Sequence, residues 1–278
     1  MRGVGLSIAL TMAMAGTACA EEFEEIDIEF NILPSARPKS FWSDLFDTRA
    51  NRKRPFDYLS GGMPDKMIYF GGIDVTQWGV GAHGTAQWMP NGVNQNGFIL
   101  RMFLSESLER YTDRSGKYAT QISRAFLLPG YMVRIGKMEA QLLVGPDAEV
   151  DLFFRNGRST HSRARFGMRG VADLWWEPTS ELMVQYALSG TTIDSGYNTR
   201  IAAGWRMFDA FWVGPEAAVS SDYFSRQTRF GAHLTGLRTN EYEWTFAAGH
   251  VSDNFGRDGV YARFGLLLRP KRAPFFEN

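Results

Sequence analysis

Apolar and polar residues alternate with a period of two along most of the chain. In residues 163–176 the even positions are apolar, as at Phe166 and Met168. The odd positions carry charges, as at Arg165 and Arg169. Because successive side chains of a β-strand point to opposite faces, the pattern predicts strands with one apolar and one polar face. The segments that we predict as strands are 67–76, 80–89, 97–106, 118–135, 138–150, 162–177, 181–188, 198–207, 211–220, 225–238, 241–252 and 259–270.

The connections between these strands alternate in length. Those after the odd-numbered strands are long and include 107–117, 151–161, 189–197 and 253–258, with 77–79 as a short exception. Those after the even-numbered strands are short and include 136–137, 178–180, 208–210 and 239–240. Long loops at one end and tight turns at the other are typical of outer-membrane barrels whose termini both lie in the periplasm. The sequence therefore predicts an all-β fold: a transmembrane, outer-membrane, antiparallel, up-and-down β-barrel of about 12 strands, with ten or fourteen as alternatives.

Five tryptophans fall near the ends of the predicted strands. Aromatic rings gather at the two lipid–water interfaces of membrane barrels, so we predict that these rings form girdles there. They are Trp88, Trp175, Trp176, Trp205 and Trp212.

The first twenty residues have the pattern of a signal peptide. Arg2 provides the positive charge, 4–14 is apolar, and Ala-Cys-Ala at 18–20 resembles a cleavage site. The signal peptide 1–20 therefore predicts export, with the outer membrane as destination. The alternative is a lipoprotein that keeps Cys19 as its N-terminus.

The composition and residue pattern of the remaining chain differ from one segment to the next. An acidic start, a basic run and several prolines indicate an irregular periplasmic N-terminal segment over 21–65. The barrel follows over 66–270, and 271–278 is a C-terminal tail. Beyond residue 20 no apolar run approaches the roughly 18 residues that a transmembrane helix needs.

Composition and motifs exclude several classes of function. The chain has 30 basic and 30 acidic residues, which argues against nucleic-acid binding through bulk positive charge. A single cysteine leaves no disulfide framework and no paired-cysteine metal site. His83, His161 and His233 stand alone without metal-ligand spacing, and the familiar hydrolase and nucleotide-binding motifs are absent from the sequence. We therefore predict no metal, no cofactor and no nucleic-acid partner.

With the large apolar residues facing lipid, the opposite faces line a lumen. That assignment predicts a charged, arginine-rich and net basic interior. The arginines either pair with carboxylates inside a narrow barrel or line a hydrated passage for a polar chain. The candidate residues for lining the lumen and contacting such a chain are Arg101, Arg163, Arg165, Arg169, Arg206, Arg229, Arg263, Asp147 and Glu216.

Two segments repeat the order glycine, proline, acid, at 145–147 and 214–216. Proline cannot donate a hydrogen bond to a neighbouring strand, so both segments predict β-bulges. Beyond each bend, Asp147 and Glu216 are expected to face the lumen as partners for arginine.

Several motifs together resemble a known family. They are Tyr-Phe-Gly-Gly-Ile-Asp at 69–74, Leu-Pro-Gly-Tyr at 128–131, Val-Gly-Pro-Asp at 144–147, Gly-Pro-Glu-Ala at 214–217 and Asp-Gly-Val-Tyr at 258–261. In this order and spacing they resemble the cellulose biosynthesis protein BcsS family of Gram-negative, mainly alphaproteobacterial, origin, over about residues 66–268. The resemblance implies an outer-membrane component that accompanies a cellulose synthase and assists glucan export. Its implied partners are the cellulose synthase secretion machinery, the glucan chain and outer-membrane lipid, and it transfers no catalytic residues.

Two other functions stay open. His250 and Ser252 share one face of a predicted strand, which resembles the His-x-Ser pair of outer-membrane lipid A deacylases. Such an enzyme needs a carboxylate beside the histidine, but Asp253 points to the opposite face and Asp258 is predicted in a loop. The other alternative is a general porin that favours anions. Our main prediction is non-enzymatic.

Overall fold

The structure is a computed structural model that describes residues 66–113, 116–222, 225–239 and 242–268. The predicted signal peptide, the 21–65 segment and the 271–278 tail lie outside the described residues. No helix among the described residues is long and apolar enough to cross a membrane. The strands are β1 (Met67–Thr76), β2 (Gly79–Trp88), β3 (Gly97–Asp113), β4 (Gly116–Ile135), β5 (Met138–Arg155), β6 (Arg158–Trp176), β7 (Leu182–Thr191), β8 (Tyr197–Met207), β9 (Phe211–Ser221), β10 (Arg226–Thr239), β11 (Tyr242–Asp253) and β12 (Asp258–Leu268).

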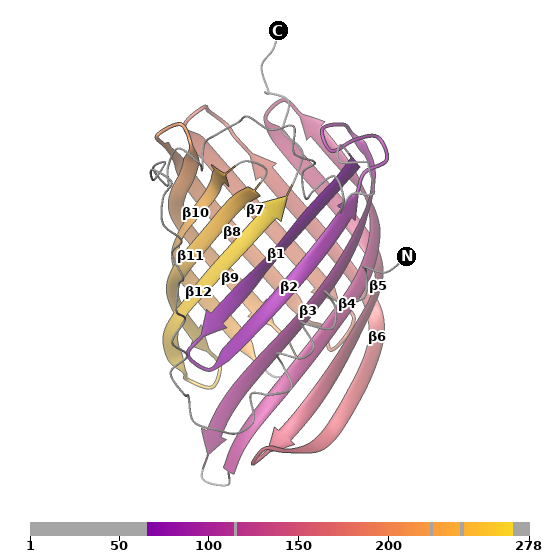
Figure 1. Cartoon of the computed structure of the whole chain (residues 1–278), viewed down its shortest axis with the longest axis vertical. Helices are drawn as coiled ribbons and strands as arrows, with labels where there is room; N and C mark the ends of the chain where they lie inside the picture. Colours follow the sequence, from indigo (N-terminus) through magenta and orange to yellow (C-terminus); the bar gives the residue numbers. More distant parts are fainter. Residues whose placement is uncertain (1–65, 114–115, 223–224, 240–241, 269–278) are drawn as a thin grey trace, which may run out of the picture. The chain divides into compact units, whose positions relative to one another are not determined.

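The twelve strands close into one antiparallel barrel. Each strand pairs with its neighbours in the chain, and β1 also pairs with β12, from Tyr69 opposite Leu268 to Thr76 opposite Tyr261. The indigo β1 accordingly lies beside the yellow β12 in Figure 1. The predicted all-β, up-and-down barrel is confirmed, with twelve strands rather than ten or fourteen.

The barrel has two unlike ends. We call the end where β1 begins and β12 finishes the terminal end, and the opposite end the extended end. β3, β4, β5 and β6 contain 17, 20, 18 and 19 residues, whereas β1, β2 and β7 contain 10 each. The four long strands therefore project past their neighbours at the extended end, as Figure 1 shows.

These extensions replace two of the predicted long loops. The prediction of loops at 107–117 and 151–161 is wrong, because β3 to β6 continue as strands through most of these residues. β5 and β6 join through Asn156 and Gly157 with φ values of 50° and 76°, the conformation of a tight two-residue hairpin turn. On the neighbouring hairpin the rings of Tyr111 and Tyr118 stack at 4.9 Å.

The predicted bulges at the two glycine-proline-acid segments are also wrong. β4 and β5 keep one register across the first segment, with Phe126 opposite Asp147 and Gly130 opposite Leu143. A Cβ atom on Gly145 would collide with the carbonyl oxygen of Leu127, so the glycine permits a close approach of the two strands without shifting them. The register shifts instead at 153–154 in β5 and at 235–237 in β10.

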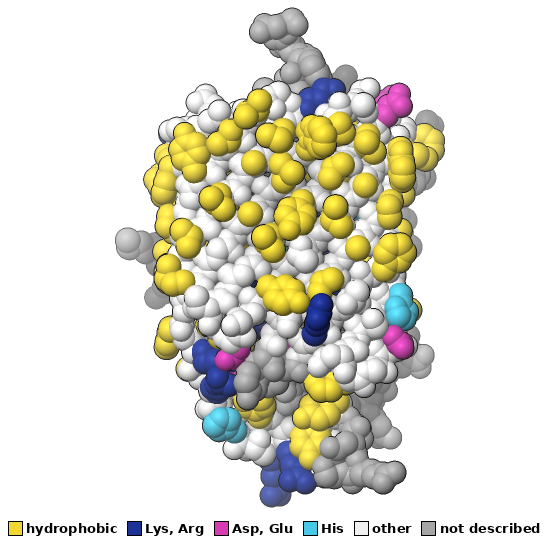
Figure 2. All heavy atoms as spheres, turned by 180° about the vertical axis from the view of Figure 1, so that it is seen from behind, with side chains coloured by type: hydrophobic (Ala, Val, Ile, Leu, Met, Phe, Trp, Pro, Cys, Tyr) yellow, Lys and Arg dark blue, Asp and Glu magenta, His cyan; other side chains and the backbone are white. Residues whose placement is uncertain are grey.

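The outer face of the barrel is apolar. Figure 2 shows hydrophobic side chains spread over the barrel wall, with charged side chains mainly nearer the extended end. Ile201 and Phe166 are 52% and 83% exposed, and both belong to the apolar face that the alternation assigned to lipid. Apolar residues outside and polar residues inside are the arrangement of transmembrane barrels.

The tryptophans are divided between the two faces. Trp88, Trp176 and Trp205 are exposed, as expected of girdle residues. Trp212 is only 5% exposed and lies inside, so the girdle prediction is wrong for this residue. The guanidinium of Arg206 lies 4.6 Å above its ring.

An apolar cluster fills part of the interior at the terminal end. Met89 and Val93, from the connection between β2 and β3, pack there against inward-facing strand residues. All members are between 0% and 7% exposed, so this part of the barrel is a packed core. The cluster consists of Met89, Val93, Ile99, Leu128, Met132, Leu143 and Val171.

Candidate functional site

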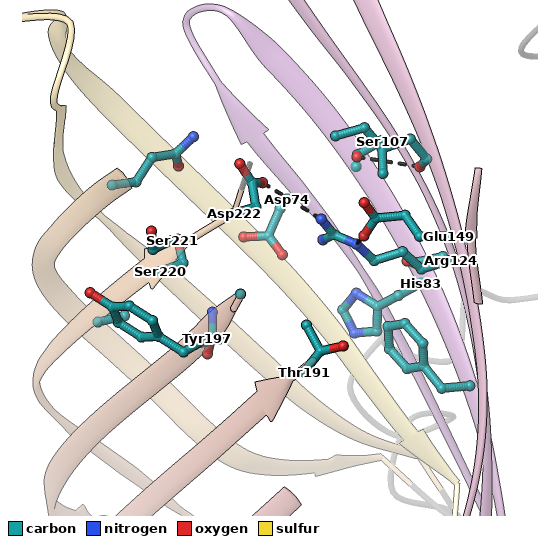
Figure 3. Close-up of a pocket in the computed structure, with 18 of the residues that line it drawn as sticks. Asp74, His83, Ser107, Arg124, Glu149, Thr191, Tyr197, Ser220, Ser221 and Asp222 are labelled. Carbon is teal, nitrogen blue, oxygen red and sulfur yellow. Dashed lines mark hydrogen bonds and ion pairs between the residues drawn. The ribbon is translucent and has the colours of Figure 1, made fainter. Parts of the chain in front are cut away.

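A charged cavity occupies the interior between the middle of the barrel and the extended end. We call it the central cavity; its volume is about 350 Å³, and Figure 3 shows part of its lining. The carboxylates that line it are Asp74, Glu106, Glu109, Glu149, Asp194 and Asp222. The guanidinium groups are those of Arg124, Arg169, Arg200, Arg229 and Arg263. Six carboxylates against five guanidinium groups show that the expectation of a net basic interior is wrong for this cavity.

A second cavity of about 340 Å³ lies between the central cavity and the terminal end. His83, Arg124 and Arg169 line both cavities, so the two are neighbours. The second cavity reaches Arg101, which forms a salt bridge of 2.7 Å with Asp173 across the barrel. The other nitrogens of Arg101 donate to Gln87 and Gln141 at 2.9 and 2.7 Å. The second cavity also touches Val171, a member of the apolar cluster at the terminal end.

The first ion-pair cluster lies on β4, β5 and β6. Arg165 of β6 pairs with Glu149 and Asp151 of β5 and with Asp194. Arg124 of β4 pairs with Glu149 from the other side and lies 3.6 Å from Asp222. In Figure 3 the Arg124 side chain lies between Glu149 and Asp222. The side chains of Asp151 and Glu149 are 0% and 5% exposed, so this cluster is buried.

The second cluster surrounds Glu216 of β9. Arg200 of β8 and Arg263 of β12 donate to its carboxylate at 3.0 and 2.5 Å. The hydroxyl of Tyr261 donates to the other oxygen at 2.8 Å. The Glu216 side chain is only 2% exposed. Its negative charge can be buried because two guanidinium groups and a hydroxyl donate hydrogen bonds to the carboxylate.

Two further pairs lie in the interior, one between distant strands and one between consecutive strands. Arg229 of β10 donates to Asp74 of β1 at 2.8 Å. Arg169 of β6 pairs with Asp147 of β5 at 2.8 Å, and the hydroxyl of Thr191 donates to the same carboxylate at 2.7 Å. Barrel closure brings the first pair together across 155 residues of chain.

The structure brings most of the predicted lumen residues into this interior. Arg163 lies toward the extended end with a side chain that is 36% exposed, 3.4 Å from Asp194. Arg206 lies near the terminal end, 3.9 Å from Glu177, away from both cavities. The members found in the interior networks are Arg101, Arg165, Arg169, Arg229, Arg263, Asp147 and Glu216.

Sequence reasoning predicted Asp147 and Glu216 as arginine partners but missed Glu149 and Asp151. Asp147, Glu149 and Asp151 occupy alternate positions of β5, so all three face inward. The period-two pattern contained this signal, but Glu149 was not singled out and the strand was predicted to end at residue 150, before Asp151. Glu149 and Asp151 are the two carboxylates that hold Arg165.

The interior presents hydrogen-bonding groups that a polar ligand could use. Glu106 Oε1 and Arg229 Nε, on residues that line the central cavity, are buried and hydrogen-bond to no other described atom. Buried polar atoms in proteins normally have partners, so these atoms are suited to bind water or the hydroxyl groups of a ligand. Among the residues that the structure describes, no cluster of three His, Cys, Asp or Glu side chains is arranged to hold a metal ion.

His250 and Ser252 lie on the outer face of β11. Ser252 is opposite Asp258, the first residue of β12, so the prediction that Asp258 lies in a loop is wrong. The Nε2 atom of His250 lies 3.7 Å from the Asp258 carboxylate, and their side chains are 60% and 70% exposed. Asp253 points inward, as predicted, and pairs with Arg257 at 2.5 Å.

Sequence comparisons give one extended match and one local match. A family model described as cellulose biosynthesis protein BcsS matches residues 68–270. One chain of the snaclec coagulation factor IX/factor X-binding protein of Gloydius halys is 36% identical over 93 residues, which are 33% of this chain. The match spans only 58% of the length of that relative.

Several solved barrels are remotely similar. The transport unit of the autotransporter AIDA-I from Escherichia coli has a TM-score of 0.46 at 11% identity, with 82% of this chain and 95% of that chain covered. The KdgM porin has a TM-score of 0.43 at 10% identity, with 73% and 99% covered. The translocator domain of the autotransporter NalP from Neisseria meningitidis has a TM-score of 0.43 at 12% identity, with 77% and 93% covered.

Proposed function

The chain belongs to the cellulose biosynthesis protein BcsS family, and we propose that it assists export or assembly of the glucan chain as a non-catalytic outer-membrane barrel. The observation that carries the proposal is that the family match, 68–270, covers the strand region of the barrel except its first residue, Met67. Its proposed partners are the cellulose synthase secretion machinery and the glucan chain.

The apolar outer face supports a membrane location. Large side chains such as Leu142 and Val144 are 69% and 57% exposed on this face, which is unfavourable in water and favourable in lipid. With the signal peptide predicted at 1–20, we assign the protein to the outer membrane. The terminal end then faces the periplasm and the extended end faces outward, because both termini of such barrels lie in the periplasm.

The interior favours an assisting role over that of an anion porin. The central cavity has more carboxylates than guanidinium groups, so it offers anions no net attraction. At the terminal end, residues such as Leu128 and Met132 are 0% exposed and occupy space that a porin leaves to water. We therefore expect the purified protein to conduct ions poorly in planar bilayers. A large, anion-selective conductance would favour the porin.

The proposal is tested by cellulose output in a strain that lacks the gene. We expect deletion to lower extracellular glucan, measured by dye binding and enzymatic glucan assay, and the wild-type gene to restore it. The double variant Asp74→Asn with Arg229→Gln removes both members of an interior ion pair, so it leaves no unpaired buried charge. It should restore less glucan than His250→Ala, the matched change on the outer face. Unchanged glucan after deletion would contradict the proposal.

One contact favours a lipid hydrolase as a second candidate. Asp258 lies 3.7 Å from His250, which gives the outer-face pair of His250 and Ser252 a carboxylate partner. In this function His250 is the base, Ser252 the nucleophile and lipid A the substrate. Mass spectra of lipid A that change on deletion, and that Ser252→Ala fails to restore, would support the hydrolase. Unaltered lipid A would exclude it.

A further inference from the structure

A pocket lies at the extended end, next to the central cavity. We call it the mouth pocket; its volume is about 390 Å³. The long strands β3, β4 and β5 form one side of it, and the connection between β11 and β12 contributes two further residues. Its lining residues are Glu109, Tyr111, Thr120, Ile122, Phe153, Asp222, Phe255 and Arg257.

Aromatic rings are exposed in this pocket outside the apolar wall. Glu109 is opposite Gly79, where β2 begins, so Tyr111 lies beyond the outer end of β2 on the same inward face. Tyr111 and Phe255 are 48% and 62% exposed. Exposed apolar rings that face a pocket rather than lipid are characteristic of binding sites.

The rings are held in place by neighbouring groups. Tyr111 stacks on Tyr118 at 4.9 Å with an interplanar angle of 8°. The guanidinium of Arg257 lies 4.8 Å from the Trp78 ring and 5.4 Å from the Phe255 ring. Such contacts fix the orientation of a ring while leaving one face accessible, which lowers the entropic cost of binding.

Carboxylates outnumber guanidinium groups in the lining of the mouth pocket, with Glu109 and Asp222 against Arg257. Arg257 pairs with Asp253 at 2.5 Å and lies 3.9 Å from Glu109. Asp222 lies 3.6 Å from Arg124, and Glu109 accepts a hydrogen bond from Gln227 at 3.1 Å. A pocket with carboxylates but no excess of positive charge suits a neutral polar ligand and disfavours an acidic one.

The mouth pocket adjoins the central cavity. Glu109, Ile122 and Asp222 line both spaces. A ligand bound in the mouth pocket therefore lies next to the hydrogen-bonding groups of the central cavity.

We propose that the mouth pocket binds a neutral β-1,4-glucan chain through Tyr111 and Phe255, an inference that rests on the proposed function. The two faces of a β-linked glucose ring present C–H groups, which pack on aromatic rings. The equatorial hydroxyls lie at the rim of the ring and hydrogen-bond to carboxylates such as Glu109. The pocket thus holds the polymer at the outer opening of the barrel.

The test is binding of cellohexaose to the full-length protein purified in detergent, measured by titration calorimetry. We expect Tyr111→Ala and Phe255→Ala each to weaken binding about tenfold, since each removes the burial of one aromatic face. Phe208→Ala is the matched control, because Phe208 is 84% exposed in the turn between β8 and β9 at the terminal end. It should bind as the wild type does. Heat-modifiable mobility on gels verifies that every variant is folded.

A charged analogue tests the class of ligand. A β-1,4-linked oligoglucuronate of equal length has the same backbone with carboxylates in place of the C6 hydroxymethyl groups, and we expect it to bind more weakly than cellohexaose. No binding of cellohexaose, equal affinities for wild type and both ring variants, or tighter binding of the oligoglucuronate would each overturn the inference.

The experiments distinguish a failure of the mouth-pocket inference from a failure of the proposed function. Loss of extracellular glucan on deletion, together with wild-type affinity in Tyr111→Ala and Phe255→Ala, would overturn the mouth pocket alone. Unchanged glucan on deletion, together with weakened binding in both variants, would support the pocket and contradict the role in cellulose production.

Discussion

The two halves of the barrel interior are built on opposite principles. Toward the terminal end, Leu128, Met132 and Leu143 are at most 1% exposed and pack as a core. Toward the extended end, inward-facing positions of the same strands carry Arg124 and Glu149, which line a cavity of about 350 Å³. The β-strand alternation is the same in both halves, so the difference lies only in which side chains occupy the inward positions.

The contrast separates two requirements of the barrel. Apolar side chains fill space without needing partners, so the terminal half gains stability from close packing. Ion pairs contribute little net stability when buried, but they keep an interior polar and able to exchange hydrogen bonds. The charged half is therefore the part of the interior suited to a polar ligand.

The largest expected effect comes from leaving buried charges unpaired in the charged half. Arg165→Gln removes the partner of Asp151 and one of the two partners of Glu149, and we expect it to lower the free energy of unfolding by about 3–5 kcal/mol. Urea unfolding in lipid vesicles measures this loss.

Arg163→Gln is the control for that variant. Arg163 lies two residues away on the same face, but its side chain is 36% exposed and has Asp194 at 3.4 Å. We expect it to change the unfolding free energy by less than about 1 kcal/mol. Equal losses in the two variants would show that the depth of the charge in the interior is unimportant.

In the packed half, Leu143→Ala should open a cavity and lower the unfolding free energy by about 2–5 kcal/mol. Leu142→Ala is the matched change, because Leu142 is 69% exposed on the outer face of the same strand. It should lose less, since lipid refills the space. Similar losses in the same urea assay would contradict a packed core at the terminal end.

Removing both members of an ion pair should matter much less than removing one. Asp74→Asn with Arg229→Gln is expected to change the unfolding free energy by about 1 kcal/mol or less, whereas each single change should cost more. A double-mutant cycle measures the coupling between the two groups. A double variant less stable than either single variant would show that the charges themselves stabilise this half.

The smallest effect is expected on the outer face. His250→Ala removes a side chain that is 60% exposed, with Asp258 at 3.7 Å, so we expect stability to change by no more than about 0.5 kcal/mol. Thermal unfolding in the same vesicles measures it. A loss as large as that of the Leu143→Ala variant would assign the histidine a structural role.

Some features of the fold were predictable because they depend on local pattern. Alternation placed all twelve strands and put residues such as Phe166 outside and Arg165 inside. The tight turn at Asn156 and Gly157 was also encoded locally, since Asn-Gly favours two-residue hairpins, but the surrounding polar residues were interpreted as a loop. The strand extensions were missed for that reason.

Other features depended on neighbours that the sequence does not identify. A glycine followed by proline at 145–146 predicted a bulge, but the pairing of β4 and β5 shows a close approach in register. The adjacent strand decided this outcome. Trp212 is a different case: it was assigned to an interface, but it lies four residues from Glu216 on β9, so the alternation itself places it on the inward face.

The sequence by itself determined the all-β barrel, the two faces of the wall and the family to which the motifs pointed, because period-two alternation and motif order are properties of the chain alone. The tertiary structure decided among ten, twelve and fourteen strands, which arginine meets which carboxylate, and where the interior is packed or hollow. Asp74 and Arg229 are 155 residues apart and pair at 2.8 Å because the barrel closes. Such a contact depends on the position of every strand between them, and no local pattern specifies it.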